Sequence, residues 1–489
     1  MHTSCMSSTP FFSGFHKILF GRRRSKLAGQ LDLLGPSALD HLRLLFGAFL
    51  PHDVLKIDEA AQGKGINSRE AIFTPALTFW AFLSQVLSPG SSCRQALTKV
   101  QILCAHLKCK APLSDTSVYC KARHRLQADD LKSIHRHSAG RLEANTPRES
   151  MWKGFRALLV DATTASMPDT KENQQRWPQS SNQAEGCGFP TMTIVGLFSL
   201  ASCALIDFVH DTLKTDENRL LYKLKELLGV GDLIVGDRLY CTYANICWLM
   251  ERGAEVVFRK HQSRNSEKCK IERLSKNDRI VHWTKPQSKA GHRGLTRELW
   301  DTLKQTLRVR EVTFQVECKG YRTRKITLVT TLLDPDKYPP ESLAELYLKR
   351  WRIELWFDDI KTSMQMDVLR CKTPEMIEKE VLMHMIAYNL VRSVMQAAGI
   401  TYGESMEALS FKGAVDRISE WAWPIYSAST ARERESMQSK LLKNIAEDLL
   451  EHRPGRYEPR VVKRRPKAYP AMKQPRQKYR DEFAASQVS

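Results

Sequence analysis

The stretch YLKRWRIELWFDDIK, Tyr347 to Lys361, constrains the fold more than any other part of this chain. Four polar groups in it recur at helical spacing: Tyr347, Arg350, Glu354 and Lys361. At about 3.6 residues per turn, Tyr347 and Lys361 would lie within about 20° of Glu354, and Arg350 within about 40°. The spacing therefore predicts one helix with all four side chains along a single exposed edge.

Beside that edge runs an apolar stripe that would seat the helix against a core. It is made by Leu346, Ile353, Phe357, Ile360 and Met364. A carboxylate on the exposed edge can hold a metal ion, and cations on either side can hold phosphate oxygens. The alternative is an ordinary solvated helix face, on which Arg350 and Glu354 form an i,i+4 ion pair.

The same residues resemble a signature of bacterial insertion-sequence transposases of the DDE class, in the insertion-sequence-4 family. The signature, Y-(2)-R-(3)-E-(6)-K, is matched without a gap by Tyr347, Arg350, Glu354 and Lys361. The resemblance extends upstream through LVTTLLDPDKYPPESLAELY and downstream to MQMDVLR. It implies a DNA transposase that cuts at the terminal inverted repeats of its own insertion sequence and joins the 3′ ends to target DNA.

The charge of the chain indicates a polyanionic partner. Its 489 residues carry a formal net charge of +21, which suits nucleic acid or an anionic membrane surface. No run approaches the roughly 18 apolar residues that span a bilayer. The N-terminal FFSGFHKILFGRRRSK places its arginines after a short apolar patch, whereas a secretory signal has its charge first. We therefore expect a cytoplasmic, nucleoid-associated protein that binds double-stranded DNA.

The twelve cysteines are scattered and include no C-x-x-C pair, as expected for a protein without disulfides. Cys104, His106 and Cys109 lie close together in ILCAHLKCK, which hints at zinc. Because no second ligand pair follows at finger spacing, ordinary buried thiols are the favoured interpretation.

Residues 1–145 are predicted to form an N-terminal helical domain. TPALTFWAFLSQVLS places apolar residues at helical spacing, and LSDTSVYCKARHRLQ should carry Lys121, Arg123 and Arg125 on its surface. The resemblance implies that this domain binds the ends of the element. The alternative is a helical bundle that only packs on the next domain.

From Phe155 the pattern changes from helices to strands. RALLVDATTASMPD reads as an apolar strand ending at Asp161, and DLIVGDRLYC as another ending at Gly236 and Asp237. The order is three antiparallel strands, a helix, a strand, a helix and a strand, which is typical of an α/β, ribonuclease H-like fold. In that fold the first and fourth strands are neighbours, so the two aspartates should meet within a catalytic domain at 150–400.

A β-rich insertion is expected at about 260–325, before the glutamate helix. LRVREVTFQVE and YRTRKITLVTTLL flank Cys318-Lys319-Gly320, a predicted hairpin turn. Relatives that flip a DNA base carry a tryptophan on the returning strand, and this chain has Ile326 at that place. Trp283 and Trp300 are candidates to replace it.

The C-terminal part begins with a long amphipathic helix, predicted from Thr373 to Gly399, that would close the catalytic domain. A helical segment at 401–452 follows. The tail at 453–489 is basic and rich in proline, so we expect it to be extended or disordered.

Asp161, Asp237 and Glu354 are thus the predicted catalytic and metal-binding triad, suited by their oxygen ligands to two Mg²⁺ or Mn²⁺ ions. Tyr347, Arg350 and Lys361 are predicted to hold DNA phosphates. Joining two element ends implies at least a homodimer in the complex with DNA. The alternatives are a nuclease of the same fold without strand transfer, and a catalytically inactive DNA-binding protein derived from a transposase.

Overall fold

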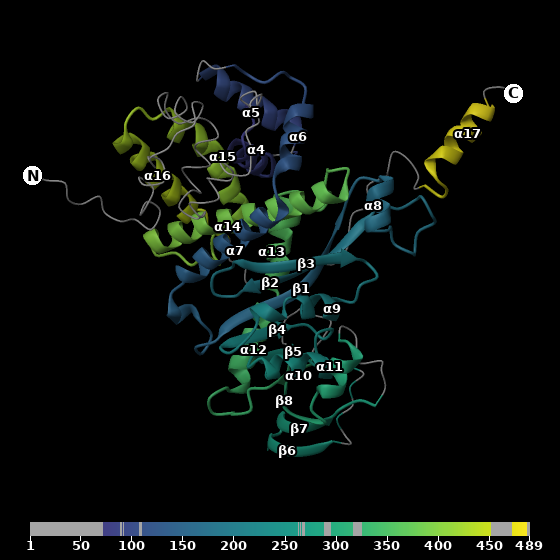
Figure 1. The fold of residues 1–489 in the computed structure, drawn as a ribbon. Coiled ribbons are helices and arrows are strands. Elements are labelled where there is room, and N and C mark those ends of the chain that lie inside the picture. The colour runs from purple at the N-terminus through teal and green to yellow at the C-terminus, as the bar shows by residue number, and fades with distance from the viewer. Residues whose placement is uncertain are drawn as a thin grey trace, which may run out of the picture.

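The described residues build a nine-stranded sheet through the middle of the protein, in the order β3-β2-β1-β4-β5-β9-β8-β7-β6 (Figure 1). The computed structural model describes residues 72–88, 90, 92–106, 110–262, 264, 266, 269–287, 295–315, 325–450 and 472–486. The strands are β1 (Arg156–Ser166), β2 (Thr191–Ser199), β3 (Leu205–Thr212), β4 (Asp232–Gly236), β5 (Glu255–Arg259), β6 (Lys270–Ser275), β7 (Asp278–Thr284), β8 (Thr306–Gln315) and β9 (Lys325–Thr330).

The first five strands have the predicted pairing. β1 pairs antiparallel with β2 and parallel with β4, β2 pairs antiparallel with β3, and β4 pairs parallel with β5. The first and fourth strands are therefore neighbours. The expectation that Asp161 and Asp237 lie close together depended on this pairing.

The predicted insertion continues this sheet. β6, β7 and β8 pair in antiparallel succession, and β9 joins them to β5. β8 and β9 form the predicted hairpin, with Phe314 opposite Ile326. The turn at Cys318–Gly320 lies outside the described residues.

Helices cover both faces of the sheet (Figure 1). They are α4 (Pro75–Leu87), α5 (Cys93–His106), α6 (Ser117–Arg125), α7 (Ala128–Ala144), α8 (Lys171–Arg176), α9 (Glu217–Lys223), α10 (Tyr243–Glu251), α11 (Arg297–Thr302), α12 (Pro340–Lys349), α13 (Arg352–Asp358), α14 (Pro374–Tyr402), α15 (Phe411–Ser427), α16 (Ala431–Ala446) and α17 (Arg476–Ser486). The described parts of the N-terminal region and of 401–452 are helical, as predicted.

The alternation of side chains along β1 divides the interior into two cores. Leu159 belongs to the core that contains α13, α14 and the N-terminal helices. Leu158 and Val160 belong to the core that contains α9 and α10. Because both faces of the strand are buried, β1 is a nearly continuous apolar run up to Asp161.

The central helix is not continuous, which corrects the prediction from the spacing. α12 ends at Lys349, α13 begins at Arg352, and a π-helical turn, η5, occupies Asp359–Ser363. The chain is overwound at the first break, where Ile353 N bonds Arg350 O at 3.1 Å. It is underwound in η5, where Met364 N bonds Asp359 O at 3.1 Å. The uniform step of about 100° per residue therefore does not apply across this stretch.

The tail is also not extended throughout. Residues 476–486 form α17, so the expectation of an extended or disordered segment is wrong there. The last proline before this helix is Pro475, and none follows it in the sequence. Proline excludes helix only near its own position.

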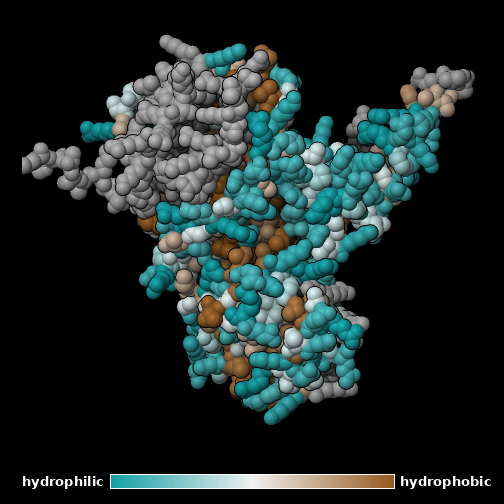
Figure 2. Space-filling model, in the orientation of Figure 1, coloured by the Kyte–Doolittle hydropathy of each residue, from teal (hydrophilic) through white to brown (hydrophobic). Residues whose placement is uncertain are grey.

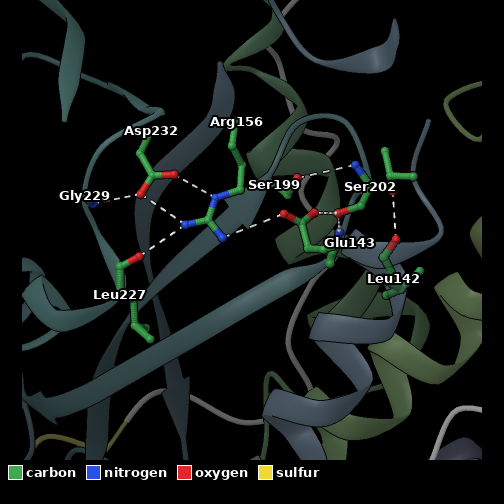
Figure 3. A network of polar contacts seen from close by, with 10 residues as sticks. Leu142, Glu143, Arg156, Ser199, Ser202, Leu227, Gly229 and Asp232 are labelled. Carbon is green, nitrogen blue, oxygen red and sulfur yellow. Dashed lines mark hydrogen bonds and ion pairs between the residues drawn. The ribbon is translucent and has the colours of Figure 1, made fainter. Parts of the chain in front are cut away.

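A polar network anchors α7 to the end of the sheet at which the central strands β1 and β4 begin (Figure 3). Arg156 donates to both oxygens of Asp232, at 2.7 and 3.1 Å, and to Leu227 O at 3.2 Å. The third nitrogen of Arg156 lies 3.9 Å from Oε2 of Glu143 on α7. The other oxygen of Glu143, Oε1, accepts from the hydroxyl of Ser202. The network fixes the start of the parallel pair whose other end carries the candidate site.

The face shown in Figure 2 is mainly hydrophilic around α8 and over β6 and β7, with apolar residues gathered near the middle. Within the described part of the chain, no helix combines the length and apolar content that crossing a lipid bilayer requires.

Candidate active site

Asp161 and Asp237 occupy equivalent places on neighbouring strands. The parallel pairing of β1 with β4 ends at Leu159 and Val235, and each aspartate follows two residues later. Residues two apart on a strand point to the same face, so both carboxylates lie on the face covered by α13. Asp161 lies within β1, which continues to Ser166, so the prediction that the strand ends at Asp161 is wrong.

A glycine lets the glutamate helix approach this place. Gly196 pairs with Asp161 across β1 and β2. A Cβ atom at Gly196 would lie 3.0 Å from the Phe357 ring and 2.8 Å from that of Phe198. The rings of Phe198 and Phe357 meet edge to face, with centroids 5.1 Å apart. This contact brings α13, and Glu354 with it, against the strand that carries Asp161.

Arg350 joins two of the predicted carboxylates. Its guanidinium donates to Asp161 Oδ2 at 3.0 Å and to Glu354 Oε1 at 3.1 Å. Its side chain is only 8% exposed, whereas that of Glu354 is 47% exposed. Among the described residues its Nε has no hydrogen-bond partner. Arg350 is therefore an internal bridge of the site and does not lie on an exposed edge.

Burial and charge act against each other at these groups. Burial raises the pKa of Asp161; the amide of Ala162 and the guanidinium of Arg350 oppose this, while Asp237 and Glu354 reinforce it. Burial tends to lower the pKa of Arg350, but Tyr347, Asp161 and Glu354 outweigh it, so the net pKa is raised. Asp161 is thus close enough to Asp237 and to Glu354 for both carboxylates to act on it electrostatically.

Tyr347 and Lys361 are placed differently from each other. Tyr347 is 2% exposed, so the expectation that its phenol lies along an exposed edge is wrong. Lys361 lies in η5 and is half-buried. Its ammonium has no hydrogen bond or ion pair with the described residues, and it remains available for an anion.

The donor atoms suit a hard divalent cation, because they are all carboxylate oxygens. One oxygen of Asp237 accepts from Leu239 N at 2.7 Å, and its other oxygen has no partner among the residues that the structure describes. One oxygen of Glu354 is likewise unengaged there. No group of three His, Cys, Asp or Glu residues in the described ranges is arranged to hold a metal ion, and Arg350 lies between Asp161 and Glu354.

The sequence analysis missed Glu217, the first residue of α9. Its Oε2 accepts from the hydroxyl of the fully buried Tyr240 at 3.0 Å. Burial raises the pKa of Glu217, the Tyr240 hydrogen bond opposes this, and Asp161 and Asp237 add to the rise. An acidic residue in the first turn of a helix is usually an ordinary response to the helix dipole, so the sequence carried no distinguishing signal.

The candidate base-flipping aromatics are all buried. Trp283 is 1% exposed, and its Nε1 donates to Glu311 at 3.4 Å. Trp300 and Ile326 are each 5% exposed. Trp283 and Trp300 are therefore unavailable to stack on an extruded base in this conformation.

Lys121 and Arg125 on α6 are exposed, as predicted, but Arg123 is not. It is 5% exposed, lies over the rings of Phe82 and Tyr119, and contacts Cys371 Sγ at 3.8 Å. Of the three residues that hinted at a zinc site, Cys109 and the side chain of His106 lie outside the described residues. Cys104 is buried and is not part of a disulfide among the described residues.

The chain is similar in sequence to known transposases. Residues 152–390 match the family described as Transposase DDE domain. The chain is 27% identical over 453 residues to the transposase InsG for insertion sequence element IS4 of Escherichia coli (strain K12), covering 90% of this chain and 96% of that protein. It is 35% identical over 69 residues to the putative transposase InsL for insertion sequence element IS186A of the same strain, covering 14% of this chain and 19% of that protein.

A solved structure, the cryo-EM structure of the piggyBac transposase synaptic complex with hairpin DNA, aligns over 86% of this chain and 87% of that chain. The TM-score is 0.40 at 11% identity, which is too low to establish a shared fold.

Proposed function

We propose that the protein cuts DNA at the terminal inverted repeats of its own insertion sequence and joins the freed 3′ ends to target DNA, and the match of residues 152–390 to the family described as Transposase DDE domain supports this. The observation that carries the proposal is that Arg350 bridges Asp161 and Glu354, at 3.0 and 3.1 Å, while Asp237 follows β4 at the place equivalent to that of Asp161 on β1. The strand order β3-β2-β1-β4-β5 supports a ribonuclease H-like core for this chemistry.

Asp161, Asp237 and Glu354 would hold the divalent cations through their carboxylate oxygens. The chemistry supplied by two bound Mg²⁺ or Mn²⁺ ions is activation of the attacking oxygen and stabilisation of the leaving oxygen in phosphodiester displacement. The attacking group is water in the first cut and the freed 3′-hydroxyl in joining, so the protein needs no nucleophile of its own.

Lys361, Arg350 and Tyr347 have different roles in this proposal. Lys361 holds a DNA phosphate beside the cut, which its unpaired ammonium supports. Arg350 orients Asp161 and Glu354 in the metal-free protein and turns to DNA only when that bridge opens. Tyr347, buried beside Arg350, supports the guanidinium, whose carbon lies 5.9 Å from the centre of the phenol ring.

The partners follow from the reaction. Two DNA ends must be held together, so the active complex contains at least a homodimer acting on nucleoid DNA in the cytoplasm. The N-terminal helices provide end binding, and the surplus of positive charge over the whole chain, formally +21, favours contact with the phosphate backbone.

The test uses supercoiled plasmid carrying the DNA that flanks the gene on each side, with Mg²⁺. Asp161→Asn, Asp237→Asn and Glu354→Gln should each reduce cleavage by about a thousandfold or more, because several kcal/mol of transition-state stabilisation is lost. The matched control is Asp358→Asn: this exposed carboxylate lies on the same helix as Glu354, and its one hydrogen-bond donor within the described part of the chain is Thr362, at 2.6 Å.

Cleavage that survives any of the three substitutions would refute the triad. Cleavage by the wild type without joining of the 3′ ends to a target would identify a nuclease. Specific end binding without either reaction would identify an inactive DNA-binding protein.

A further inference from the structure

The turn that follows β4 is held by hydrogen bonds at Asp237 and after it. Leu239 N donates to Asp237 Oδ1 at 2.7 Å, and Thr242 N donates to Tyr240 O at 2.8 Å. The hydroxyl of Thr242 caps α10 by accepting from Asn245 N at 3.1 Å. The direction of the Asp237 carboxylate therefore depends on how this turn is anchored.

Two further bonds tie the turn to the start of α9. The Tyr240 hydroxyl donates to Glu217 Oε2 at 3.0 Å. Asn245 Nδ2 donates to Tyr240 O at 3.0 Å and to Asn218 Oδ1 at 2.6 Å. Tyr240 is fully buried, so its hydroxyl has no access to water that could replace Glu217.

The link reaches the site from the side opposite to the glutamate helix. Tyr240 and the apolar residues of α9 belong to one core, whereas Phe357 of α13 belongs to the other. Glu354 is thus held from one face of the sheet, and the turn that carries Asp237 is held from the other face.

We propose that the hydrogen bond from Tyr240 to Glu217 is a positioning device, which sets the Asp237 carboxylate opposite Asp161 for metal binding. Glu217 acts through Tyr240 and does not itself bind metal or DNA. This inference rests on the proposed role of Asp237. Removing a hydrogen bond made directly to a metal ligand costs about 10- to 100-fold in metal affinity. The bond from Tyr240 to Glu217 acts on Asp237 only through the turn, so we expect a loss at the lower end of that range.

The key variant is Tyr240→Phe, which keeps the buried ring and removes the hydroxyl. The Mg²⁺ concentration for half-maximal plasmid cleavage should rise about tenfold, while the rate at saturating Mg²⁺ stays within about threefold of wild type. In the metal-free protein, hydrogen exchange should accelerate in the peptide 237–242. Direct Mn²⁺ binding, followed by electron paramagnetic resonance without DNA, should weaken by a similar factor.

Two variants of Glu217 separate positioning from direct charge. Glu217→Gln keeps an oxygen that accepts from Tyr240, so its Mg²⁺ midpoint should stay within about twofold of wild type. Glu217→Ala should behave like Tyr240→Phe, and the double variant should be no worse than either single variant. If Glu217→Gln is as impaired as Tyr240→Phe, the charge of Glu217 acts at the metal and the positioning role is refuted.

The matched control is Tyr243→Phe, since Tyr243 is another buried tyrosine of the same core and donates to Lys304 O at 2.6 Å, away from the site. Loss of the Tyr243 hydroxyl should leave the Mg²⁺ concentration for half-maximal cleavage unchanged. Equal midpoints for Tyr240→Phe and Tyr243→Phe would overturn the inference. Cleavage by Asp237→Asn at the wild-type rate would instead overturn the proposed function, so the two failures are distinguishable.

Discussion

Replacing Arg310 with Met should cause a large loss of stability in the insertion. Arg310, on β8, is fully buried and donates to both oxygens of Asp278 on β7, at 2.8 and 2.5 Å. Its remaining nitrogen donates to Tyr338 O at 2.7 Å, and more weakly to Leu332 O at 3.4 Å and Asp334 O at 3.3 Å. One guanidinium thus fastens the insertion to the chain that leads into α12.

The magnitude follows from what the substitution leaves behind. Asp278 is 3% exposed, so its carboxylate would stay buried without a partner. Breaking a buried pair in this way costs about 3–5 kcal/mol, and the carbonyl oxygens lose their donor as well. Adding Asp278→Asn should recover about half of the loss, because it removes the stranded charge.

The assay is urea unfolding followed by tryptophan fluorescence, with hydrogen exchange in the peptide 332–338 as a local readout. Arg308→Met is the control: Arg308 lies on the same strand, is 50% exposed and pairs with Glu272 at 3.3 Å. The control should change stability by less than about 1 kcal/mol. A loss below about 1 kcal/mol for Arg310→Met, with unchanged exchange at 332–338, would refute the reasoning.

Three further outcomes are expected. Lys361→Ala should lower DNA affinity and reduce the slope of log affinity against log salt by about one; an unchanged slope in an anisotropy titration would make this lysine a bystander. Deleting 453–489 should weaken binding to random duplex and to the element's ends by similar factors, and loss of end binding alone would contradict that. Gly196→Val should push Phe357 outward, cost about 1–3 kcal/mol in thermal unfolding and slow cleavage, whereas Gly229→Val, in an open turn where a Cβ would meet only Arg252 O at 3.7 Å, should affect cleavage far less.

The sequence was informative where chemistry is local to a strand or a motif. Apolar runs that stop at a carboxylate located Asp161 and Asp237, because an uncompensated acid is unfavourable inside a sheet with two buried faces. The order of strands and helices in the sequence then predicted that β1 and β4 are neighbours, and they pair in parallel in the structure.

It was misleading where tertiary contacts override the regular helix. Assuming a uniform helix placed Tyr347 and Arg350 on an exposed edge, but both side chains are buried, Tyr347 within α12 and Arg350 at the break before α13. Arg123 was misplaced for a related reason: its neighbours Phe82 and Cys371 are distant in sequence, so no local pattern could reveal that it is buried. Glu217 acquires its significance only through Tyr240.

The continuous sheet also limits how such a protein can exchange parts during evolution. β9 pairs with β5 and leads directly into α12, so the inner hairpin β8–β9 cannot be lost without exposing an unpaired edge beside the aspartates. β6 and β7 lie at the far end of the sheet. Recombination between related elements should therefore be tolerated at this outer pair, where strands can be lengthened, shortened or replaced while the inner hairpin is inherited together with the glutamate helix.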